Sequence, residues 1–333
     1  MNRKEFVQLI QKRMLRGVYL FEGVEENIKS ATLQQLRKAV LPEGLEELNE
    51  VTLENPETSA VIAAAETLPF MAEQRLIIIR EHSALLRGDA DEPLLTYLQH
   101  VPETALIVFY HKDKADARKK LYKAIDKLGG LVSFQKLSDA ELNDWIRMRF
   151  SKAGKECSGA TASLLSFMAG TDTQQLRTEI DKLIDYAGAS PQITDEAVRA
   201  IVTRSAEYNV FLLVDAVIAG QSAKAFALLR EMLTNGEERV GILAMLLRQY
   251  RMLQHIKIMQ YEKCSSQQMQ EALGLKSFAL EKNIRQARNL SGSRVKQAVD
   301  LCVDTEYAIK SGRLNQEGAL EACMLRLMEK NAS

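Results

Sequence analysis

Proline is missing from the whole C-terminal part of this sequence. The chain has 333 residues and six prolines, and the last of them is Pro191. Proline interrupts the interior of a helix because it lacks a backbone N–H and clashes with the preceding turn. The residues after Pro191 carry apolar side chains at helical spacing almost throughout. We therefore expect a nearly pure helical assembly there.

Cysteine and histidine are also scarce, with four of each. The cysteines form no Cys-x-x-Cys pair, and no histidine lies within four residues of a cysteine or another histidine. Cys302 and Cys323 stand in apolar helical patterns, where a cysteine behaves as a small hydrophobe. This usage excludes a disulfide scaffold and argues against a zinc site or a Cys/His catalytic pair.

Net charge and long apolar runs are absent as well. Lys plus Arg and Asp plus Glu number 44 each, so the chain lacks the uncompensated positive charge of a bulk polyanion binder. No apolar run approaches the ~18 residues of a membrane span. The N-terminal residues enter an amphipathic pattern at once, without the apolar stretch of a signal peptide. We expect a cytoplasmic protein with no membrane partner.

Residues 1–137 are predicted to form an α/β domain with a parallel sheet flanked by helices. Strands are expected at 17–21, 47–53, 75–79, 105–110 and 131–134, and helices at 24–40, 59–67, 93–100 and 116–128. The runs at 75–79 and 105–110 are continuously apolar, which is typical of parallel strands buried on both faces. Alternating strands and helices indicate this architecture.

Helical patterns replace the strands from Ser138 onward. Ser138 and Glu141 form a capping box, which marks the start of a helix. Further helices are expected at 159–169, 172–187 and 194–203, giving a small helical domain at 138–208. A new helix is predicted near Asn209, and about six helices continue through an all-helical domain at 209–333.

The loop after the first predicted strand partly matches a phosphate-binding loop. The motif G-x-x-x-x-G-K-[ST] places Gly23, Lys29 and Ser30 in register. Its second glycine is replaced by Ile28, whose branched side chain disfavours close approach of the backbone to a phosphate. Two glutamates at 25 and 26 would repel a polyphosphate. We interpret this as a degenerate P-loop that does not bind nucleotide.

Other catalytic signatures are also missing. The strands at 75–79 and 105–110 end in Arg80-Glu81-His82 and His111-Lys112-Asp113, without the acid that holds Mg²⁺ in P-loop ATPases. G-x-S-x-G, H-E-x-x-H and G-x-G-x-x-G motifs do not occur. The sequence favours an interaction protein with no catalytic residues, metal or cofactor. An ATPase that tolerates Ile28 and a helical adaptor of another kind remain as alternatives.

Five regions of the sequence match one known family: Val18-Tyr19-Leu20-Phe21-Glu22-Gly23, Glu66 to Arg80, Arg118-Lys119-Lys120-Leu121-Tyr122-Lys123-Ala124, Leu176 to Tyr186 with Ile193 to Val198, and Asn209 to Ala216 with Ile309-Lys310-Ser311-Gly312. On these residues the whole chain resembles the delta-subunit family of the bacterial DNA polymerase III clamp loader. Each motif is weak alone, but they occur in order and in register over three domains.

The resemblance implies an AAA+-like fold without ATPase activity, with residues 138–208 as a lid-like domain and 209–333 as a collar for assembly. It implies a non-catalytic subunit of a DNA-directed DNA polymerase holoenzyme. Such a subunit binds the sliding clamp (the beta subunit) and opens it for loading onto primed DNA. The implied partners are the ATPase subunits and a delta-prime-like subunit of a hetero-pentameric ring.

The clamp-binding residues implied by the resemblance are Leu68, Pro69, Phe70 and Met71. In the family an apolar pair follows Leu-Pro, usually Leu-Phe, and here the pair is Phe70 and Met71. The residues themselves support this, because an apolar cluster is unusual in a helix-to-strand turn. Proline lowers the cost of ordering such a loop on binding. The alternative is that the cluster folds back onto its own sheet.

Two basic features are candidates for contact with DNA or another subunit. The first is Arg118, Lys119 and Lys120, diluted by nearby acidic residues, for which a solvated helix face is the simpler interpretation. The second is Arg248 and Arg251, which with His255 line one side of a predicted helix. Subunit or phosphate contact and an ordinary exposed face are equally compatible with this spacing.

Overall fold

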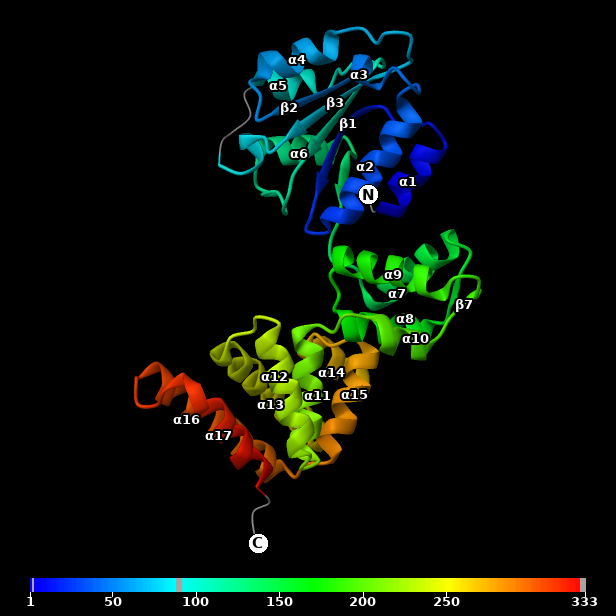
Figure 1. Cartoon of the computed structure of the whole chain (residues 1–333). Helices are drawn as coiled ribbons and strands as arrows, with labels where there is room; N and C mark the ends of the chain where they lie inside the picture. Colours follow the sequence, from blue (N-terminus) through cyan, green and yellow to red (C-terminus); the bar gives the residue numbers. More distant parts are fainter. Residues whose placement is uncertain (2, 88–91, 330–333) are drawn as a thin grey trace. The chain divides into compact units, whose positions relative to one another are not determined.

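The computed structural model describes residues 1, 3–87 and 92–329 (Figure 1). The chain divides into two compact units, Met1–Leu137 and Ser138–Ser333, and each is described here by itself. The boundary between the units falls where the α/β domain was expected to end. The further division at 208/209 stays a prediction, and the last four residues of the expected C-terminal domain lie outside the described part.

The first unit is built on a five-stranded parallel sheet, as predicted. Its strands are β1 (Gly17–Glu22), β2 (Glu50–Glu54), β3 (Arg75–Arg80), β4 (Ala105–Tyr110) and β5 (Leu131–Ser133), in the order β2-β3-β4-β1-β5. The continuously apolar runs are the strands β3 and β4, which lie inside the sheet and are buried on both faces.

Helices cover both faces of this sheet (Figure 1). Helices α1 (Arg3–Gln11) and α2 (Glu26–Val40) lie on one face, where the ring of Phe6 packs edge-on against Tyr19 and Phe21 at 5.0 Å between centroids. The other face carries α4 (Thr58–Glu66), α5 (Glu92–Tyr97), α6 (Lys120–Lys127) and the short 3-10 helix η1 (Ser83–Leu85). Because all strands are parallel, their first residues lie together at one end of the sheet and their last residues at the other. These two ends are called the amino edge and the carboxyl edge.

Several boundaries in the first unit differ from the prediction; the helix expected at 93–100, for example, ends at Tyr97. Two differences have a visible cause. The strand expected at 47–53 starts at Glu50, because residues 46–49 form the short helix α3 (Glu46–Asn49), whose last two N–H groups bond the Leu45 carbonyl. The helix expected at 116–128 begins only at Lys120. The Asp116 side chain accepts the N–H of Arg118, and its carbonyl accepts the N–H of Lys119, so a turn precedes the helix.

The second unit is helical, as predicted from its helical patterns and, after Pro191, from the absence of proline. Its helices are α7 (Asp139–Lys152), α8 (Gly159–Ala169), α9 (Thr173–Ala187), α10 (Asp195–Ile201), α11 (Ala206–Ile218), α12 (Ser222–Thr234), α13 (Arg239–Tyr261), α14 (Ser266–Leu273), α15 (Ser277–Arg288), α16 (Gly292–Lys310) and α17 (Gln316–Met328). The Ser138 capping box is present, and Ser, Thr or Asp side chains cap several other helix starts. A two-stranded parallel sheet, β6 (Glu156–Cys157) with β7 (Gln192–Ile193), was not predicted.

Helix α13 lies at the centre of the C-terminal helices and packs against α11, α15, α16 and α17. Its buried side is apolar and includes Leu246, Tyr250 and Leu253. Cys302 and Cys323 are buried in the same core, as their apolar surroundings in the sequence indicated. None of the helices in the described ranges is both long enough and apolar enough to cross a membrane.

Candidate functional site

The lysine of the degenerate P-loop is fully buried and points into the protein. Lys29 lies in the first turn of α2 with 0% of its surface exposed. Its Nζ donates to the backbone carbonyls of Gly23 at 2.8 Å, His111 at 2.6 Å and Lys112 at 2.7 Å. The Glu26 carboxylate lies 3.0 Å from the same nitrogen. A lysine ammonium has three donors, so Lys29 has none left for a phosphate.

The backbone of the same loop is committed to the fold. The Gly23 N–H donates to the Asp113 carbonyl at 2.9 Å, and the Glu25 N–H donates to the Phe134 carbonyl at 3.1 Å. A phosphate loop works because such N–H groups stay available to the anion. Gly23 has φ +116°, and a Cβ on it would lie 2.4 Å from the Phe134 carbonyl oxygen. The glycine is needed for close packing of the loop against the segment after β5.

Other residues of this corner reinforce the closed arrangement. Ile28 lies on the buried side of α2, whereas Ser30 lies on the exposed side of the same helix. The Tyr110 hydroxyl donates to the Glu26 carboxylate, and burial together with this bond raises the pKa of Tyr110. Glu26 thus pairs with the lysine that would have to bind a phosphate, and this corner of the carboxyl edge connects α2 to the ends of β1 and β4.

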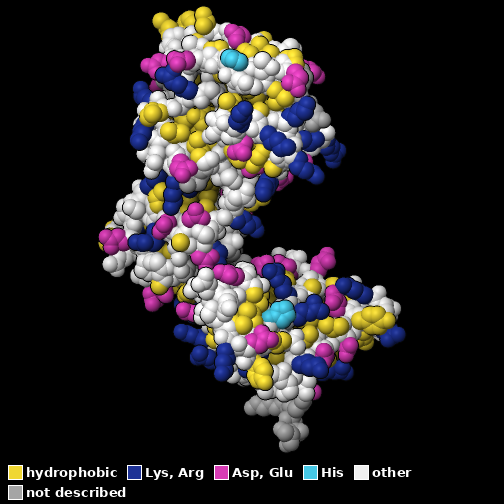
Figure 2. Space-filling model, turned by 180° about the vertical axis from the view of Figure 1, so that it is seen from behind, with side chains coloured by type: hydrophobic (Ala, Val, Ile, Leu, Met, Phe, Trp, Pro, Cys, Tyr) yellow, Lys and Arg dark blue, Asp and Glu magenta, His cyan; other side chains and the backbone are white. Residues whose placement is uncertain are grey.

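The loop of residues 67–74, between α4 and β3, is an apolar projection at the opposite, amino edge. Leu68, Phe70 and Met71 are 74%, 53% and 79% exposed, and Pro69 is half-buried. The alternative in which these side chains fold back onto the sheet is therefore wrong. Figure 2 shows hydrophobic side chains gathered at an outer edge of the first unit. Exposed large apolar side chains that cluster in this way mark interaction sites.

The backbone of the 67–74 loop is held in place despite its exposed side chains. At its end, the Gln74 amide donates to the carbonyls of Leu15 at 3.1 Å and Glu103 at 3.0 Å. In its middle, Asn49 of α3 bonds both the N–H and the carbonyl of Phe70. The sequence reasoning missed Asn49, because nothing in a single sequence connects two residues that lie 21 positions apart.

The basic residues before and within α6 have acidic partners. The Arg118 guanidinium donates to both carboxylate oxygens of Asp116, at 2.9 and 2.8 Å, which lowers the pKa of Asp116 and raises that of Arg118. The Nζ of Lys120 lies 3.5 Å from a carboxylate oxygen of Glu92. Of the three predicted contact residues, only Lys120 belongs to a helix. Pairing reduces the charge that Arg118 and Lys120 offer to DNA, and contact there stays a prediction.

Arg248 and Arg251 lie on the exposed side of α13, together with His255. Ile258, one turn further, is also exposed, so this side of the helix mixes basic and apolar groups. Figure 2 shows basic and hydrophobic side chains interleaved over the C-terminal helices. A mixed surface of this kind suits contact with another protein better than it suits phosphate binding alone.

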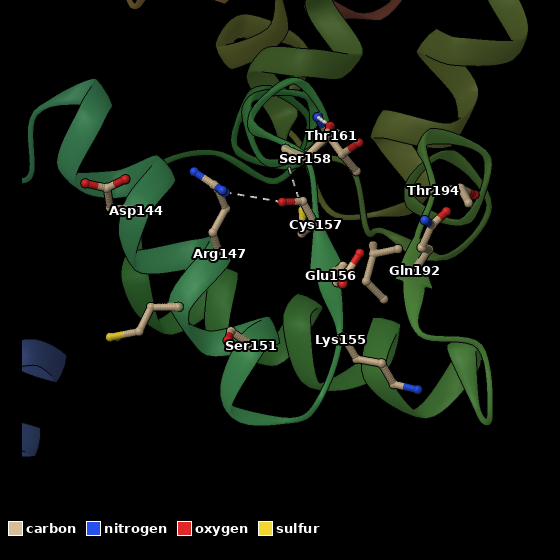
Figure 3. Close-up of a pocket in the computed structure, with 12 residues that line it drawn as sticks. Asp144, Arg147, Ser151, Lys155, Glu156, Cys157, Ser158, Thr161, Gln192 and Thr194 are labelled. Atoms are coloured by element: carbon tan, nitrogen blue, oxygen red, sulfur yellow. Dashed lines mark hydrogen bonds between the residues drawn. The ribbon is translucent and has the colours of Figure 1, made fainter.

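A hollow of about 830 Å³ lies between α7 and the β6–β7 pair in the second unit (Figure 3). Arg147 points across it and donates to the Cys157 carbonyl at 3.3 Å. Burial raises the pKa of the Cys157 thiol to about 11, so the sulfur is protonated at neutral pH and is a poor nucleophile. Across the described residues, no cluster of His, Cys, Asp and Glu side chains is arranged to hold a metal ion.

Comparison with known proteins points to one family. The family model described as "DNA polymerase III, delta subunit" matches residues 19–135, and "DNA polymerase III delta subunit, C-terminal domain" matches residues 207–327. DNA polymerase III subunit delta of Bacillus subtilis (strain 168) is 25% identical over 97% of the chain and 96% of its own length. The Escherichia coli (strain K12) subunit is 23% identical over 89% and 87%.

A solved structure supports the same fold over the whole length. The Bacillus subtilis DNA clamp loader delta protein covers 98% of this chain and 99% of its own, with a TM-score of 0.62 and 24% sequence identity. This likeness concerns the fold, including the order of an α/β unit followed by helices.

Proposed function

Because the chain belongs to the delta-subunit family of DNA polymerase III, we propose that it binds the sliding clamp through the 67–74 loop. In this proposal it is a clamp-loader subunit that opens one interface of the ring-shaped clamp, so that the clamp can be placed on primed DNA. It contributes binding energy and does not hydrolyse ATP. The observation that carries the proposal is the exposure of Leu68, Phe70 and Met71 on a backbone that is fixed.

The physical reason is that a fixed loop with exposed large side chains binds without a large ordering cost. An aromatic and a methionine side chain can fill an apolar pocket of the partner and act as its main anchors. Pro69 restricts the backbone between them. A loop whose side chains were needed for the core of its own unit could not offer this surface.

The test is a binding measurement with purified sliding clamp. We expect the double variant Phe70→Ala with Met71→Ala to lose binding by at least about 100-fold, as hot-spot residues do, while its circular dichroism and Tm stay unchanged. The matched control is Leu86→Ala with Leu128→Ala, which removes two other exposed apolar side chains of the same unit. Unchanged affinity of the Phe70/Met71 variant in surface plasmon resonance would refute the proposal.

The rival function is an ATPase with a variant P-loop. The hydrogen bonds of Lys29 and of the loop backbone argue against it, because opening them would leave buried carbonyl groups without donors. We expect no heat of binding when ATP with Mg²⁺ is titrated into the chain at millimolar concentration. Saturable binding that Lys29→Met removes would favour the ATPase.

We also propose that the C-terminal helices join the ATPase subunits and the delta-prime-like subunit in the hetero-pentameric ring. Residues 138–208 pack on these helices, for example through Phe167 against Tyr208, Phe211 and Phe278. A truncation before residue 209 would expose these aromatic side chains, so variants of surface residues test the interface with less damage to the fold. Arg248→Glu with Arg251→Glu should weaken co-elution with the ATPase subunits in gel filtration and leave clamp binding intact. Co-elution at wild-type strength would exclude this side of α13 from the interface.

A further inference from the structure

Asn49 is a buried polar residue whose side chain reaches the middle of the exposed loop. We propose that it is a positioning residue for clamp binding: it holds the backbone of Phe70 in the conformation that docks. The inference rests on the proposed function of the 67–74 loop. Asn49 contributes no surface to a partner itself, since it is 0% exposed.

The contact is a reciprocal pairing of an amide side chain with a backbone unit. The Asn49 Oδ1 accepts the N–H of Phe70 at 2.7 Å, and its Nδ2 donates to the Phe70 carbonyl at 2.9 Å. Both polar groups of one loop residue are therefore satisfied from the same side, as they are in a strand ladder. The side chain of Phe70 has no part in this pairing and stays 53% exposed.

The asparagine itself sits on a fixed base. Its Nδ2 also donates to the Leu45 carbonyl at 3.0 Å, closing the turn of α3. The preceding carbonyl, that of Leu48, accepts from the Arg75 guanidinium at 2.8 Å at the start of β3. The following residue, Glu50, forms a two-pronged ion pair with Arg37 of α2. Asn49 thus connects the loop to α3, and the residues on either side of Asn49 fix that segment to β3 and α2.

The residue after Phe70 shows why such a hold is needed. Met71 has φ +49°, a left-handed conformation that costs free energy for a residue with a side chain. A free loop would leave this conformation, and the direction of the Met71 side chain would change with it. Pairing of the adjacent Phe70 backbone holds the chain at the point where the strained residue follows.

Positioning of this kind has a kinetic signature. If only a fraction of the molecules holds the docking conformation, the apparent affinity equals the intrinsic affinity multiplied by that fraction. The association rate carries the loss, because the bound state, once formed, keeps the same contacts. A residue that only stabilised the fold would change neither rate for the folded molecules.

The experiment combines hydrogen exchange with binding kinetics on the full-length chain. In the wild type, the Phe70 amide should exchange roughly tenfold or more below the rate of an unstructured peptide, although its loop is exposed. In Asn49→Ala this protection should disappear, while the amides of β3 remain protected. Association with immobilised sliding clamp should slow roughly tenfold, and dissociation should change less than about twofold.

The matched control is Asn55→Ala. Asn55 also bonds a loop backbone through its side chain, accepting the Ser83 N–H at 2.8 Å, but at the carboxyl edge. Its φ of +40° is also strained for alanine, so this variant controls for a general loss of stability. Its clamp association rate should equal the wild-type rate.

The outcomes separate the two proposals. Loss of binding in Phe70→Ala/Met71→Ala together with a wild-type association rate in Asn49→Ala would overturn the positioning role alone. Wild-type binding of the Phe70/Met71 variant would overturn the proposed role of the 67–74 loop in clamp binding. Exchange of the wild-type Phe70 amide at the unstructured rate would overturn the positioning role even if Asn49→Ala failed to fold.

Discussion

The loops at the two edges of the parallel sheet differ in which of their groups are available to a partner. At the carboxyl edge, Lys29 and the loop after β1 form their hydrogen bonds with other groups of the protein itself. At the amino edge, the 67–74 loop has its backbone fixed but its large apolar side chains exposed. The edge that carries the motif of a binding site is closed, and the edge without a motif offers a surface.

The difference teaches that a match of residue types does not locate a site. A binding site needs groups whose requirements the fold itself leaves unmet, such as free N–H groups for a phosphate or uncovered apolar area for a protein. Substitutions at the carboxyl edge should therefore act on stability, and those at the amino edge on binding. The predictions below test this separation.

The largest effect is expected for Gly23→Ala. The new Cβ would meet the Phe134 carbonyl oxygen at 2.4 Å and would need φ +116°, so we expect a loss of about 3–5 kcal/mol in the free energy of unfolding. The control is Gly17→Ala, at φ +76° with no atom within 4 Å of the new Cβ, where only about 1 kcal/mol of backbone strain applies. Urea unfolding measures both, and equal losses would show that the contact with Phe134 is unimportant.

The next effect is expected for Lys29→Met, which keeps the length of the side chain but removes its donors. Two buried carbonyls and one partly buried carbonyl lose their partner, so we expect a loss of about 2–4 kcal/mol in unfolding free energy. Lys38→Met on the exposed side of the same helix should stay within about 0.5 kcal/mol of the wild type. If Lys29→Met were as stable as the control, the lysine would be free to serve a ligand.

The smallest effect is expected for Leu48→Ser at the amino edge. Leu48 is 52% exposed and precedes Asn49, so it extends the apolar surface beside the docking loop. Contacts around the centre of an interface contribute little, and we expect clamp affinity to fall about three- to tenfold with unchanged Tm. The control is Leu128→Ser, at a leucine of the same unit that is 45% exposed, and it should bind normally. A loss as large as that of the Phe70/Met71 variant would move the centre of the docking surface toward α3.

The sheet could be predicted from sequence because its strands have a strong local signal. The apolar residues of β3 and β4 follow one another without alternating with polar residues. Such short runs are typical of a parallel strand that is buried on both faces. Short elements were missed because they have no period: α3 spans one turn, and β6 and β7 span two residues each. The start of α6 was misplaced because the Asp116 turn depends on bonds of one residue, its side chain and its carbonyl, which have no period in the sequence.

The candidate sites were predicted unevenly. The apolar residues 68–71 were singled out by the family resemblance, and their place in a turn, where polar residues are usual, supported them without deciding whether they are exposed. The burial of Lys29 was missed, although its spacing from Leu33 and Leu36 places it on the apolar side of α2. Asn49 could not have been found, because its role depends on a contact with Phe70 that only the fold creates.

The internal use of Lys29 has a consequence for timing. A loop that folds around a nucleotide changes shape when the nucleotide is bound, cleaved or released, and such a subunit can alternate between active and inactive forms. Here a lysine of the chain itself bonds three carbonyls at the centre of the loop. These bonds offer no place for a nucleotide to hide or expose the 67–74 loop. Under the proposed function, the timing of clamp binding would then depend on another chain that covers and uncovers that loop.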